Sequence, residues 1–316
     1  MKLVVQVPCL NEEQTLPLVL GSIPKKIKGI DSIEILIIDD GCTDKTVEIA
    51  KDFGVKHFVV HPQNKGLAKS FHDGVNKALE MGADIVVNTD GDNQYPQERI
   101  ADLVQPIVEG RADVVIADRQ TAKIKHFSKA KKLLQKVGTK VLNLAAGTDV
   151  ADAPSGFRAY SRDSLMQLNV VTRFSYTMET IIQAGNKNMS IVSVPVETNA
   201  KTRESRLFKN SWEHIRKSGV AITRAFIMYR PYVVFISLAV FLGLLGLIPF
   251  GRYMYFFVFK HAEAGGHIQS LLLGSVLMVG GFVSLAMGVI ADLTRINRTL
   301  LEDNLEQTRR NRFDKK

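Results

Sequence analysis

The sequence predicts an α/β fold with a mostly parallel sheet, followed by amphipathic helices and two helices that cross a membrane. Short runs of β-branched and other apolar residues alternate with helical patterns through the first part of the 316-residue chain. Two long segments nearer the C-terminus contain no charged residue. Alternation of this kind indicates βαβ units, whose parallel strands hold ligands in the loops at their carboxyl ends.

Each predicted strand is a short apolar run that ends at a polar or turn-forming residue. The expected strands are Lys2–Val7, Ile33–Ile38, Lys56–Val60, the run that ends at Asn88, Asp113–Ala117 and, later, Ser190–Val196. Apolar residues at helical spacing predict helices from Asn11–Glu13 through Ile23, up to about Asp52, from Asn64–Leu67 through Leu79, and from about Gln97 to Val108. Thr43 or Asp44 can cap the second of these helices.

Two carboxylates one residue apart follow the fourth predicted strand. Side chains two residues apart in extended backbone point to the same side, so Asp90, Asp92 and the Gln94 amide oxygen can face one cation. Mg²⁺ or Mn²⁺ usually binds through one or two carboxylates together with substrate phosphates. A solvated acidic turn is the simpler alternative.

Polar loops also follow the first two predicted strands. They carry Asn11, Glu12 and Glu13 after the first strand, and Asp39 and Asp40 after the second. Carboxylates that meet at one edge of a sheet repel one another, so a bound cation or a hydrogen-bonding ligand is the best reason to gather them. The chain has neither the G-x-G-x-x-G of dinucleotide-binding domains nor a P-loop. With these two kinds of nucleotide site excluded, a site for a nucleotide sugar remains as the interpretation of the polar loops.

The net charge of +9 predicts an anionic partner. Charge alone does not choose among nucleic acid, anionic lipid and a nucleotide substrate. The two cysteines, Cys9 and Cys42, have no Cys/His cluster around them in the sequence, so a structural zinc site is not expected. They suit a reducing compartment and are best interpreted as small buried thiols. The apolar run Leu3–Val7 is too short for a signal peptide.

Five short motifs occur at the predicted strand ends and in the segment that follows them. They are Val7–Glu13, Asp39–Asp44, Asn64–Leu67, Asp90–Gln94 and Ser155–Arg158. Together these motifs resemble those of the GT-A family 2 glycosyltransferases. Within that family the chain looks most like the polyprenyl-phosphate glycosyltransferases, the group that contains dolichol-phosphate mannose synthase. The resemblance covers roughly residues 1–210.

The resemblance implies roles for these polar residues. The nucleoside diphosphate sugar would be held by Pro8, Asn11, Glu13, Asp39 and Asp40. Asp90, Asp92 and Gln94 would hold the Mg²⁺ or Mn²⁺ that bridges its phosphates. Related enzymes close a flexible cationic loop on the diphosphate. Here Arg206, with Arg203 as the second candidate, would take that role, in place of the lysine and glycine that relatives commonly have.

Basic residues concentrate between Asp118 and Gly138, on an expected amphipathic helix. A solvated charged face would give the same pattern. By resemblance, Arg119 and Lys132, with Lys131 as a competing position, would bind the phosphate of an acceptor lipid. Lysine occupies a position on this helix where relatives often carry arginine. A single ammonium charge therefore replaces a guanidinium that can donate two parallel hydrogen bonds to one phosphate.

Asp152 precedes the Ser155–Arg158 motif, and the resemblance places such an aspartate near the reacting centre. A lipid phosphate is anionic at neutral pH and can attack without a strong base. Asp152 can therefore orient the acceptor, remove a proton, or simply cap the following turn.

Two apolar segments near the C-terminus predict membrane spans. Tyr232–Phe250 has 19 residues without a charge and Ile268–Ala291 has 24, enough to cross a hydrocarbon core of about 30 Å. Trp212–Tyr229 mixes aromatic, aliphatic and basic residues as an interfacial helix would, although an ordinary docking helix also fits. Basic residues are frequent before the first span and after the second, whereas the loop between has only Arg252 and Lys260. The positive-inside rule therefore places the N-terminal domain and the tail in the cytoplasm.

These expectations divide the chain into a GT-A domain at 1–207, an amphipathic juxtamembrane helix at 208–231, two transmembrane helices at 232–291 and a polar tail at 292–316. The tail is expected to be a solvated helix or a frayed segment, with homo-oligomer formation left open. We interpret the chain as an inverting enzyme of the cell membrane. It would transfer a hexose-type sugar from a nucleoside diphosphate to a polyprenyl phosphate, without a nucleic-acid partner.

Three alternatives remain open at this point. A membrane-tethered family 2 transferase could act on a non-lipid acceptor, and an inactive membrane scaffold could retain the fold. A processive polysaccharide synthase would normally show a Q-x-x-R-W motif and more spans, and the sequence has neither.

Overall fold

The computed structural model of the chain describes residues 1–121, 129–171, 176–199, 219–220, 223, 227, 230–260 and 267–314, without the side chains of 129–134. The chain forms two compact units. The sheet unit comprises Met1–Ala225 and Glu302–Lys316, and the hairpin unit comprises Phe226–Leu301. The C-terminal residues therefore belong with the N-terminal domain instead of forming a separate tail.

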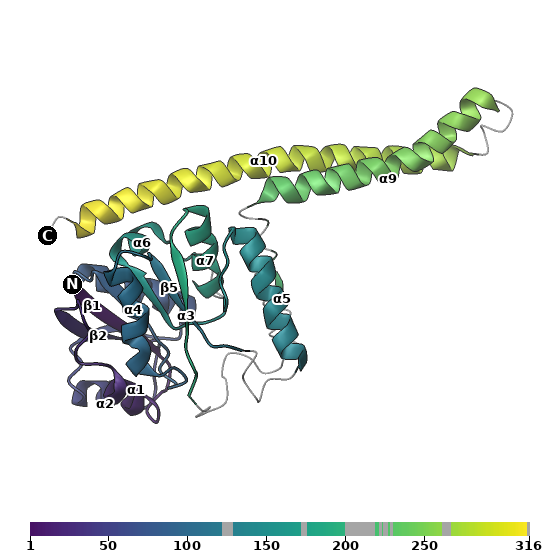
Figure 1. Ribbon diagram of the computed structural model, residues 1–316. Coiled ribbons are helices and arrows are strands. Elements are labelled where there is room, and N and C mark those ends of the chain that lie inside the picture. The colour runs from purple at the N-terminus through teal and green to yellow at the C-terminus, as the bar shows by residue number, and fades with distance from the viewer. Residues whose placement is uncertain are drawn as a thin grey trace. The chain divides into compact units, whose positions relative to one another are not determined.

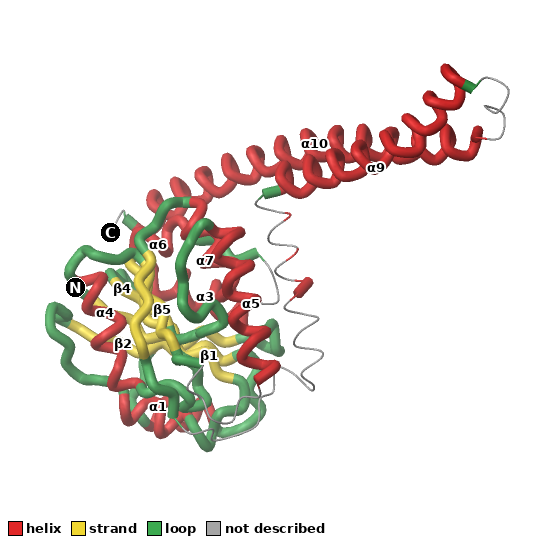
Figure 2. Tube along the Cα trace, turned by 45° about the vertical axis from the view of Figure 1, so that its right-hand side comes forward, coloured by secondary structure: helices red, strands yellow, loops and turns green. Residues whose placement is uncertain are grey.

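The sheet unit is built on seven strands, with helices on both faces of the sheet (Figures 1 and 2). The strands are β1 Lys2–Cys9, β2 Ser32–Asp39, β3 His57–Val60, β4 Ile85–Asn88, β5 Val114–Asp118, β6 Arg158–Ser161 and β7 Ile191–Pro195. The helices are α1 Leu16–Ser22, α2 Thr46–Asp52, α3 Leu67–Glu80, the 3₁₀ helix η1 Gln97–Arg99, α4 Ile100–Val108, α5 Lys129–Ala146, α6 Arg162–Gln167 and α7 Tyr176–Asn186.

The strand order is β3-β2-β1-β4-β6-β5-β7. All neighbouring pairs are parallel except the two that involve β6. The predicted α/β fold with a mostly parallel sheet is therefore confirmed.

Both faces of the central strand β1 are buried, because its alternate residues point to opposite sides. Leu3, Val5 and Val7 are fully buried in the main core, which also contains apolar residues of α1 and α4. On the other face Gln6 meets α3, and Gly74 permits the close approach. A Cβ on Gly74 would lie only 2.6 Å from Gln6 Oε1. Burial on two sides explains why β1 is apolar almost throughout.

The parallel register brings the carboxyl ends of three strands together. Cys9, at the end of β1, pairs with Asp39 at the end of β2, and Gln6 of β1 pairs with Asn88 of β4. The N–H of Asp40 donates to the carbonyl of Cys9 (3.0 Å), which continues the ladder beyond β2. The loops after β1, β2 and β4 therefore leave the sheet side by side.

Strand β6 is not predicted by the sequence patterns, and it runs antiparallel between β4 and β5. It has four residues and begins with Arg158, whose side chain is fully buried. The guanidinium donates to the carbonyls of Ala153, Ser155 and Thr177 and to the hydroxyl of Thr180, which satisfies its buried donors. A short run that starts with a charged residue gives no clear strand signal, so tertiary contacts determine this strand.

The hairpin unit contains α9, Pro231–Phe259, and the apolar part of α10, Ile268–Phe313. Both helices are long and apolar enough to cross a membrane. Most of their large apolar side chains are exposed, whereas a core helix of a soluble domain would be mostly buried. α9 extends past the charge-free run that ends at Phe250 and includes the aromatic residues up to Phe259.

α9 and α10 pack against each other along small residues of α10 (Figure 2). Gly274 and Gly281 are seven residues apart on this face. A Cβ on Gly274 would lie 2.8 Å from Phe250 N, and one on Gly281 would lie 3.1 Å from Ala239 O. Small residues of this kind let two helix backbones approach closely in a bilayer.

The last turns of α10 contact the helices of the sheet unit. Arg309 is 6% exposed, and its Nη1 donates to the carbonyls of Leu165 (3.2 Å), Met166 (3.4 Å) and Leu168 (2.5 Å). The final carbonyls of a helix lack partners within the helix, and a cation there also faces the negative end of the helix dipole. Phe313 is buried as well. The segment is therefore helical, as one of the two expectations from the sequence has it, but its last turns are docked and not solvated.

Arg309→Ala is expected to lower the free energy of unfolding of the sheet unit by about 2 kcal/mol, because hydrogen bonds from a charged group to buried carbonyls are lost. The midpoint of thermal unfolding of the detergent-solubilised protein measures the change. Arg312→Ala is the matched control on the same helix, because Arg312 is 66% exposed and pairs with Glu80 at the surface. It should change the free energy of unfolding by less than about 0.5 kcal/mol. Equal destabilisation by both variants would contradict a special role for Arg309.

Candidate functional site

The loops after β1 and β2 are joined by hydrogen bonds. Asn11, with φ of 57°, accepts at Oδ1 from the N–H of Thr43 (2.7 Å), and its own N–H lies 3.3 Å from Cys42 Sγ. Asp39 Oδ1 accepts from the N–H groups of Gly41 (3.1 Å) and Cys42 (2.7 Å). Two residues that the sequence assigns to the nucleotide therefore lie on adjoining loops at one edge of the sheet.

Pro8 and Glu13 lie at the two ends of the first loop. Pro8 is the penultimate residue of β1, opposite Ile38 of β2. The N–H of Glu13 donates to Asp44 Oδ2 (3.1 Å), and Glu13 Oε2 accepts from the N–H of Lys45 (3.2 Å). Glu13 thus braces the loop that leads into α2, and a direct contact of either residue with a nucleotide stays a prediction.

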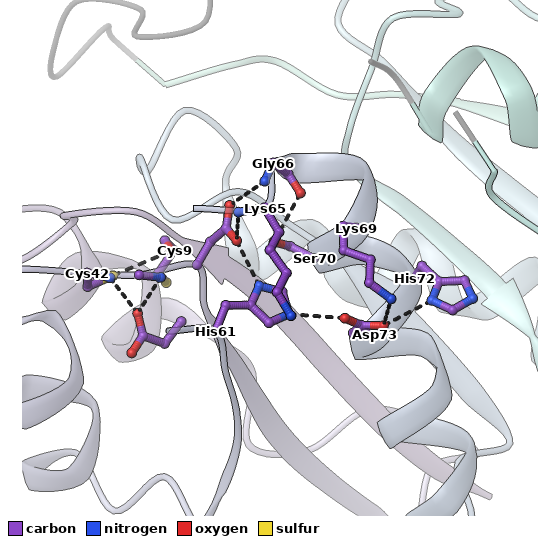
Figure 3. Close-up of polar contacts among 12 residues, drawn as sticks. Cys9, Cys42, His61, Lys65, Gly66, Lys69, Ser70, His72 and Asp73 are labelled. Carbon is purple, nitrogen blue, oxygen red and sulfur yellow. Dashed lines mark hydrogen bonds and ion pairs between the residues drawn. The ribbon is translucent and has the colours of Figure 1, made fainter. Parts of the chain in front are cut away.

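Asp40 lies behind this loop and is 5% exposed. Its Oδ1 accepts from His61 Nδ1 (2.7 Å) and from the N–H of Lys65 (2.9 Å), while Oδ2 accepts from the N–H of Gly66 (2.9 Å). The three residues that donate to this carboxylate, His61, Lys65 and Gly66, are labelled in Figure 3. Both oxygens are used inside the protein, so the structure favours a supporting role for Asp40 over the direct nucleotide contact predicted from the sequence.

Cys9 and Cys42 are free thiols beside the same loops. Burial, more than the nearby acidic groups, raises the pKa of Cys42 to about 12 and raises the pKa of Cys9 well above its usual value. Both thiols are therefore neutral near pH 7, which argues against a nucleophilic role.

The turn Asp90–Asp92 packs against the loop after β1. A Cβ on Gly91 would lie 3.2 Å from Glu12 Cγ and 3.3 Å from Cys9 Sγ. Thr15 Oγ1 donates to the carbonyl of Gly91 (2.7 Å). The two aspartates are each partly exposed. The acidic turn and the first loop therefore lie together, as the parallel strands predict.

The donors in this turn suit a hard divalent ion. Asp92 Oδ1 accepts from the N–H of Gln94 (3.1 Å), which fixes the turn. Across the part of the chain that the structure describes, no group of three or more His, Cys, Asp or Glu side chains could hold a metal by itself. The carboxylates of Asp90 and Asp92 and the amide oxygen of Gln94 are the kind of ligands that Mg²⁺ and Mn²⁺ accept alongside substrate phosphates and water. The residues therefore fit an ion that a bound diphosphate helps to hold.

Gly156, in the loop before β6, lies directly against the acidic turn. A Cβ at this position would lie 3.2 Å from Asp90 Oδ2 and 3.1 Å from the hydroxyl of Tyr176. The carbonyl of Gly156 accepts from Asn88 Nδ2 (3.0 Å) and from the Tyr176 hydroxyl (3.2 Å). Glycine is thus required for the Ser155–Arg158 motif to approach Asp90.

Arg119, which follows β5, forms a bidentate ion pair with Asp152. Its Nε lies 2.6 Å from Asp152 Oδ2 and its Nη2 lies 2.9 Å from Oδ1, while the Arg119 N–H donates to Oδ2 (3.2 Å). Burial lowers the pKa of Arg119, but the electrostatic effects of Tyr95, Asp152 and Asp90 outweigh it and raise the pKa overall. Asp152 is 4% exposed and is committed to Arg119. This geometry favours an orienting role for Asp152 over proton removal.

Arg119 keeps donors for a further anion, because the ion pair uses only part of its guanidinium. Its side chain is 18% exposed, and its partner Asp152 is joined through the N–H of Ser155 to the loop in which Gly156 lies against Asp90. The hydroxyl of Tyr95 accepts from the N–H of Gly156 (3.1 Å), and burial raises the pKa of Tyr95, so this phenol is neutral. The arrangement offers a cation beside the acidic turn that suits a phosphate.

Arg158 has a supporting role that the sequence analysis does not assign. Its guanidinium binds the carbonyls of Ala153 (2.7 Å) and Ser155 (2.7 Å), in the turn that follows Asp152. The buried cation thereby holds the backbone that presents Asp152 to Arg119. The signal in the sequence is an arginine at the start of an otherwise apolar run, and it does not reveal which carbonyls are bound.

The segment after β7 is hydrogen-bonded to the residues that directly follow Asp92. The N–H of Asn199 donates to the carbonyl of Gln94 (2.9 Å), and its Nδ2 donates to the carbonyl of Asn93 (3.0 Å). Arg203 and Arg206 follow a few residues later and lie outside the described residues. Their contact with a diphosphate stays a prediction.

Lys131 and Lys132 lie on α5, which confirms a helix at the basic segment. Their side chains are outside what the structure describes, as is most of the expected interfacial helix at 208–231. The roles predicted for these residues therefore stay untested.

Three relatives are similar to this chain over about two thirds of its length. UDP-N-acetylglucosamine–dolichyl-phosphate N-acetylglucosaminyltransferase of Methanococcus voltae is 30% identical over 217 residues, covering 61% of this chain and 83% of the relative. Polyprenol monophosphomannose synthase of Mycolicibacterium smegmatis is 25% identical, covering 67% of this chain and 82% of the relative. Dolichol-phosphate mannosyltransferase of Pyrococcus furiosus is 29% identical, covering 68% of this chain and 62% of the relative.

Among solved structures, glucosyl-3-phosphoglycerate synthase of Mycobacterium tuberculosis, in complex with Mn²⁺, UDP and phosphoglyceric acid, has a similar fold. Its TM-score is 0.54 at 20% identity, and the match covers 72% of this chain and 77% of that one. This likeness supports the fold alone. A sequence model described as glycosyl transferase family 2 matches residues 4–168, more than half of the chain. The resemblance carried by the five motifs is thereby confirmed, and the chain belongs to glycosyl transferase family 2.

Proposed function

We propose that this chain is a membrane-anchored, inverting glycosyltransferase that moves a sugar from a nucleoside diphosphate sugar to a polyprenyl phosphate. The observation that carries the proposal is that the Asp90–Asp92 turn adjoins the loops of Asn11 and Asp39, near the ion pair of Arg119 and Asp152. One edge of the sheet thus offers groups for a nucleotide, for its diphosphate and for a second phosphate. Relatives named for transfer to dolichyl or polyprenol phosphate support a lipid acceptor.

The donor would bind across the loops after β1, β2 and β4. Asn11 and Asp39 would orient the nucleoside, and Asp90 and Asp92, with the Gln94 amide oxygen, would hold Mg²⁺ or Mn²⁺. When bound, that ion neutralises the charge that develops on the departing diphosphate. The predicted arginine of the 203–206 segment would add a charge-assisted contact to the same group.

The acceptor phosphate would bind Arg119, whose orientation Asp152 fixes. A phosphate monoester is anionic at neutral pH, so no side chain has to remove a proton before it attacks. Its oxygen forms a bond to the anomeric carbon while the bond from that carbon to the nucleoside diphosphate breaks. Attack from the face opposite the leaving group inverts the anomeric centre. Lys131 or Lys132 would add a further positive charge from α5.

Membrane anchoring by α9 and α10 suits this reaction, because the acceptor is a membrane lipid. The abundance of Lys and Arg before α9 and in the last part of α10 favours a cytoplasmic catalytic domain. Nucleoside diphosphate sugars would reach the sheet edge from that side.

A panel of UDP- and GDP-linked radiolabelled sugars tests the proposal, with membranes that contain the protein and added polyprenyl phosphate. We expect label in organic-extractable material that depends on Mg²⁺ or Mn²⁺. Label only in water-soluble product would instead indicate a non-lipid acceptor. Failure to bind any sugar nucleotide in the presence of Mn²⁺ would indicate an inactive scaffold.

Asp92→Ala is expected to reduce sugar transfer at least about 100-fold, because one of the two carboxylates at the acidic turn is lost. The rate of label incorporation into lipid measures the effect, with the thermal midpoint as a check on folding. Asp102→Ala is the matched control, since Asp102 of α4 forms an exposed ion pair with Arg99 of η1. Metal-dependent transfer at the wild-type rate in Asp92→Ala would refute the metal assignment.

Asp152→Asn and Arg119→Lys are each expected to raise the KM for polyprenyl phosphate about tenfold, because both changes break the same bidentate ion pair. The double variant should lose little more than either single one, since the residues act as a unit. Steady-state kinetics with varied lipid phosphate measure these changes. A general base would behave differently: Asp152→Asn would then lower kcat strongly with little change in KM. Near-normal kinetics in Asp152→Asn would exclude both roles.

A further inference from the structure

His61, just after β3, lies between two carboxylates in the interior of the sheet unit. It is 3% exposed, and its Nδ1 lies 2.7 Å from Asp40 Oδ1 while its Nε2 lies 3.1 Å from Asp73 Oδ2. Figure 3 shows the ring with Asp73 on its α3 side. Each ring nitrogen is therefore within hydrogen-bond distance of a carboxylate oxygen, one from the loop after β2 and one from α3.

The carboxylate of Asp73 on α3 is also held by two neighbouring side chains of the same helix. Asp73 Oδ1 accepts from Lys69 Nζ (2.7 Å) and lies 3.0 Å from His72 Nδ1. Burial raises the pKa of Asp73, but the hydrogen bonds from Lys69, His72 and His61 outweigh burial and leave the pKa below its usual value. Asp73 is therefore ionised at neutral pH and gives the imidazole a fixed partner on a rigid helix.

On the opposite side of the ring, Asp40 connects His61 to two loops. The carboxylate accepts from the N–H groups of Lys65 and Gly66, at the start of α3. The backbone between Gln63 and Asn64 also touches the loop after β2, since a Cβ on Gly41 would lie 2.8 Å from Asn64 N. Glycine is required at position 41 for two reasons: its φ is 83°, and a Cβ would come too close to Asn64 N. The loop after β2 is thus fastened to the segment before α3.

The fastened loop is the one that carries the proposed donor contacts. Asp39 directly precedes Asp40, and its Oδ1 is fixed by the N–H groups of Gly41 and Cys42. Asn11 is held in turn by the N–H of Thr43. Movement of Asp40 would therefore displace Asp39 and loosen Asn11.

We propose that His61 is a positioning residue for the donor nucleotide, acting as a hydrogen-bonded bridge from Asp73 of α3 through Asp40 to the loop of Asp39. The inference rests on the proposed function, because it takes Asp39 and Asn11 as donor contacts. His61 itself does not touch the nucleotide. Its effect is to hold the binding loop in one arrangement before the donor arrives, which favours binding through pre-organisation.

His61→Gln tests the bridge, because glutamine can donate to one carboxylate but turns its carbonyl oxygen toward the other. UDP and GDP are titrated separately by calorimetry in the presence of Mn²⁺ and without lipid acceptor. We expect the Kd of the nucleotide that binds the wild-type protein to rise about tenfold. In transfer assays the KM for the matching sugar nucleotide should rise similarly while kcat changes less than about twofold, because pre-organisation acts on binding.

A compensating variant separates positioning from general loss of structure. In the double variant His61→Gln with Asp73→Asn, the new amide at position 73 can donate to the glutamine carbonyl, which restores a chain of hydrogen bonds. Its Kd is expected to return to within about threefold of wild type. His57→Gln is the matched control on β3, where His57 pairs with Glu34 near the surface, and it should leave the Kd unchanged. If His61→Gln does not fold, Asp73→Asn alone should still weaken nucleotide binding.

Several results would overturn the inference. They are wild-type Kd values in both His61→Gln and Asp73→Asn, a loss confined to kcat, or a double variant that binds more weakly than His61→Gln. A wild-type protein that binds neither UDP nor GDP would overturn both this inference and the proposed function. If nucleotide binding weakens as expected but no label reaches a lipid, the bridge stands and the lipid acceptor is wrong.

Discussion

The constraint on which the rest of the structure depends is the parallel alignment of β1, β2 and β4. Parallel strands end at the same edge of a sheet, so the polar loops after these strands must share one small region. Several of their carboxylates are buried there, and a buried carboxylate needs hydrogen-bond donors or a cation. In these loops the carboxylates accept hydrogen bonds largely from backbone N–H groups, as at Asp39 and Asp40. The site can therefore hold many acids at close quarters without becoming unstable.

The acidic residues of this edge fall into two groups with different physical roles. Asp40 and Asp152 are nearly fully buried and are satisfied by protein donors, His61 and Arg119 among them. Asp90 and Asp92 remain partly exposed at a turn. The first group fixes backbone and side chains in place, and the second group is the one that we propose holds an ion together with its phosphates. The buried side chain of Arg158 also holds the backbone of this region in place, because it binds carbonyls of the turn after Asp152.

The C-terminal part of the chain adds a second connection to the sheet unit. The apolar residues of α10 belong to the hairpin unit, whereas residues from Glu302 onward belong to the sheet unit, although both lie on one helix. Arg309 provides the main polar contact of this returning segment, and it uses carbonyls that the end of α6 leaves without helical partners. The sheet unit is thus covalently continuous with the apolar hairpin at two places in the chain.

The sequence by itself determined the features that local patterns encode. Alternating apolar runs gave the parallel α/β fold, the spacing of Asp90 and Asp92 gave the acidic turn, and two charge-free segments gave the apolar helices. Tertiary structure alone decided that Asp152 pairs with Arg119, that Asp40 faces His61, and that Arg309 docks on α6. These partners are 33, 21 and more than 140 residues apart in the chain. No periodic pattern connects them, because such contacts arise only when the sheet and its loops bring distant segments together.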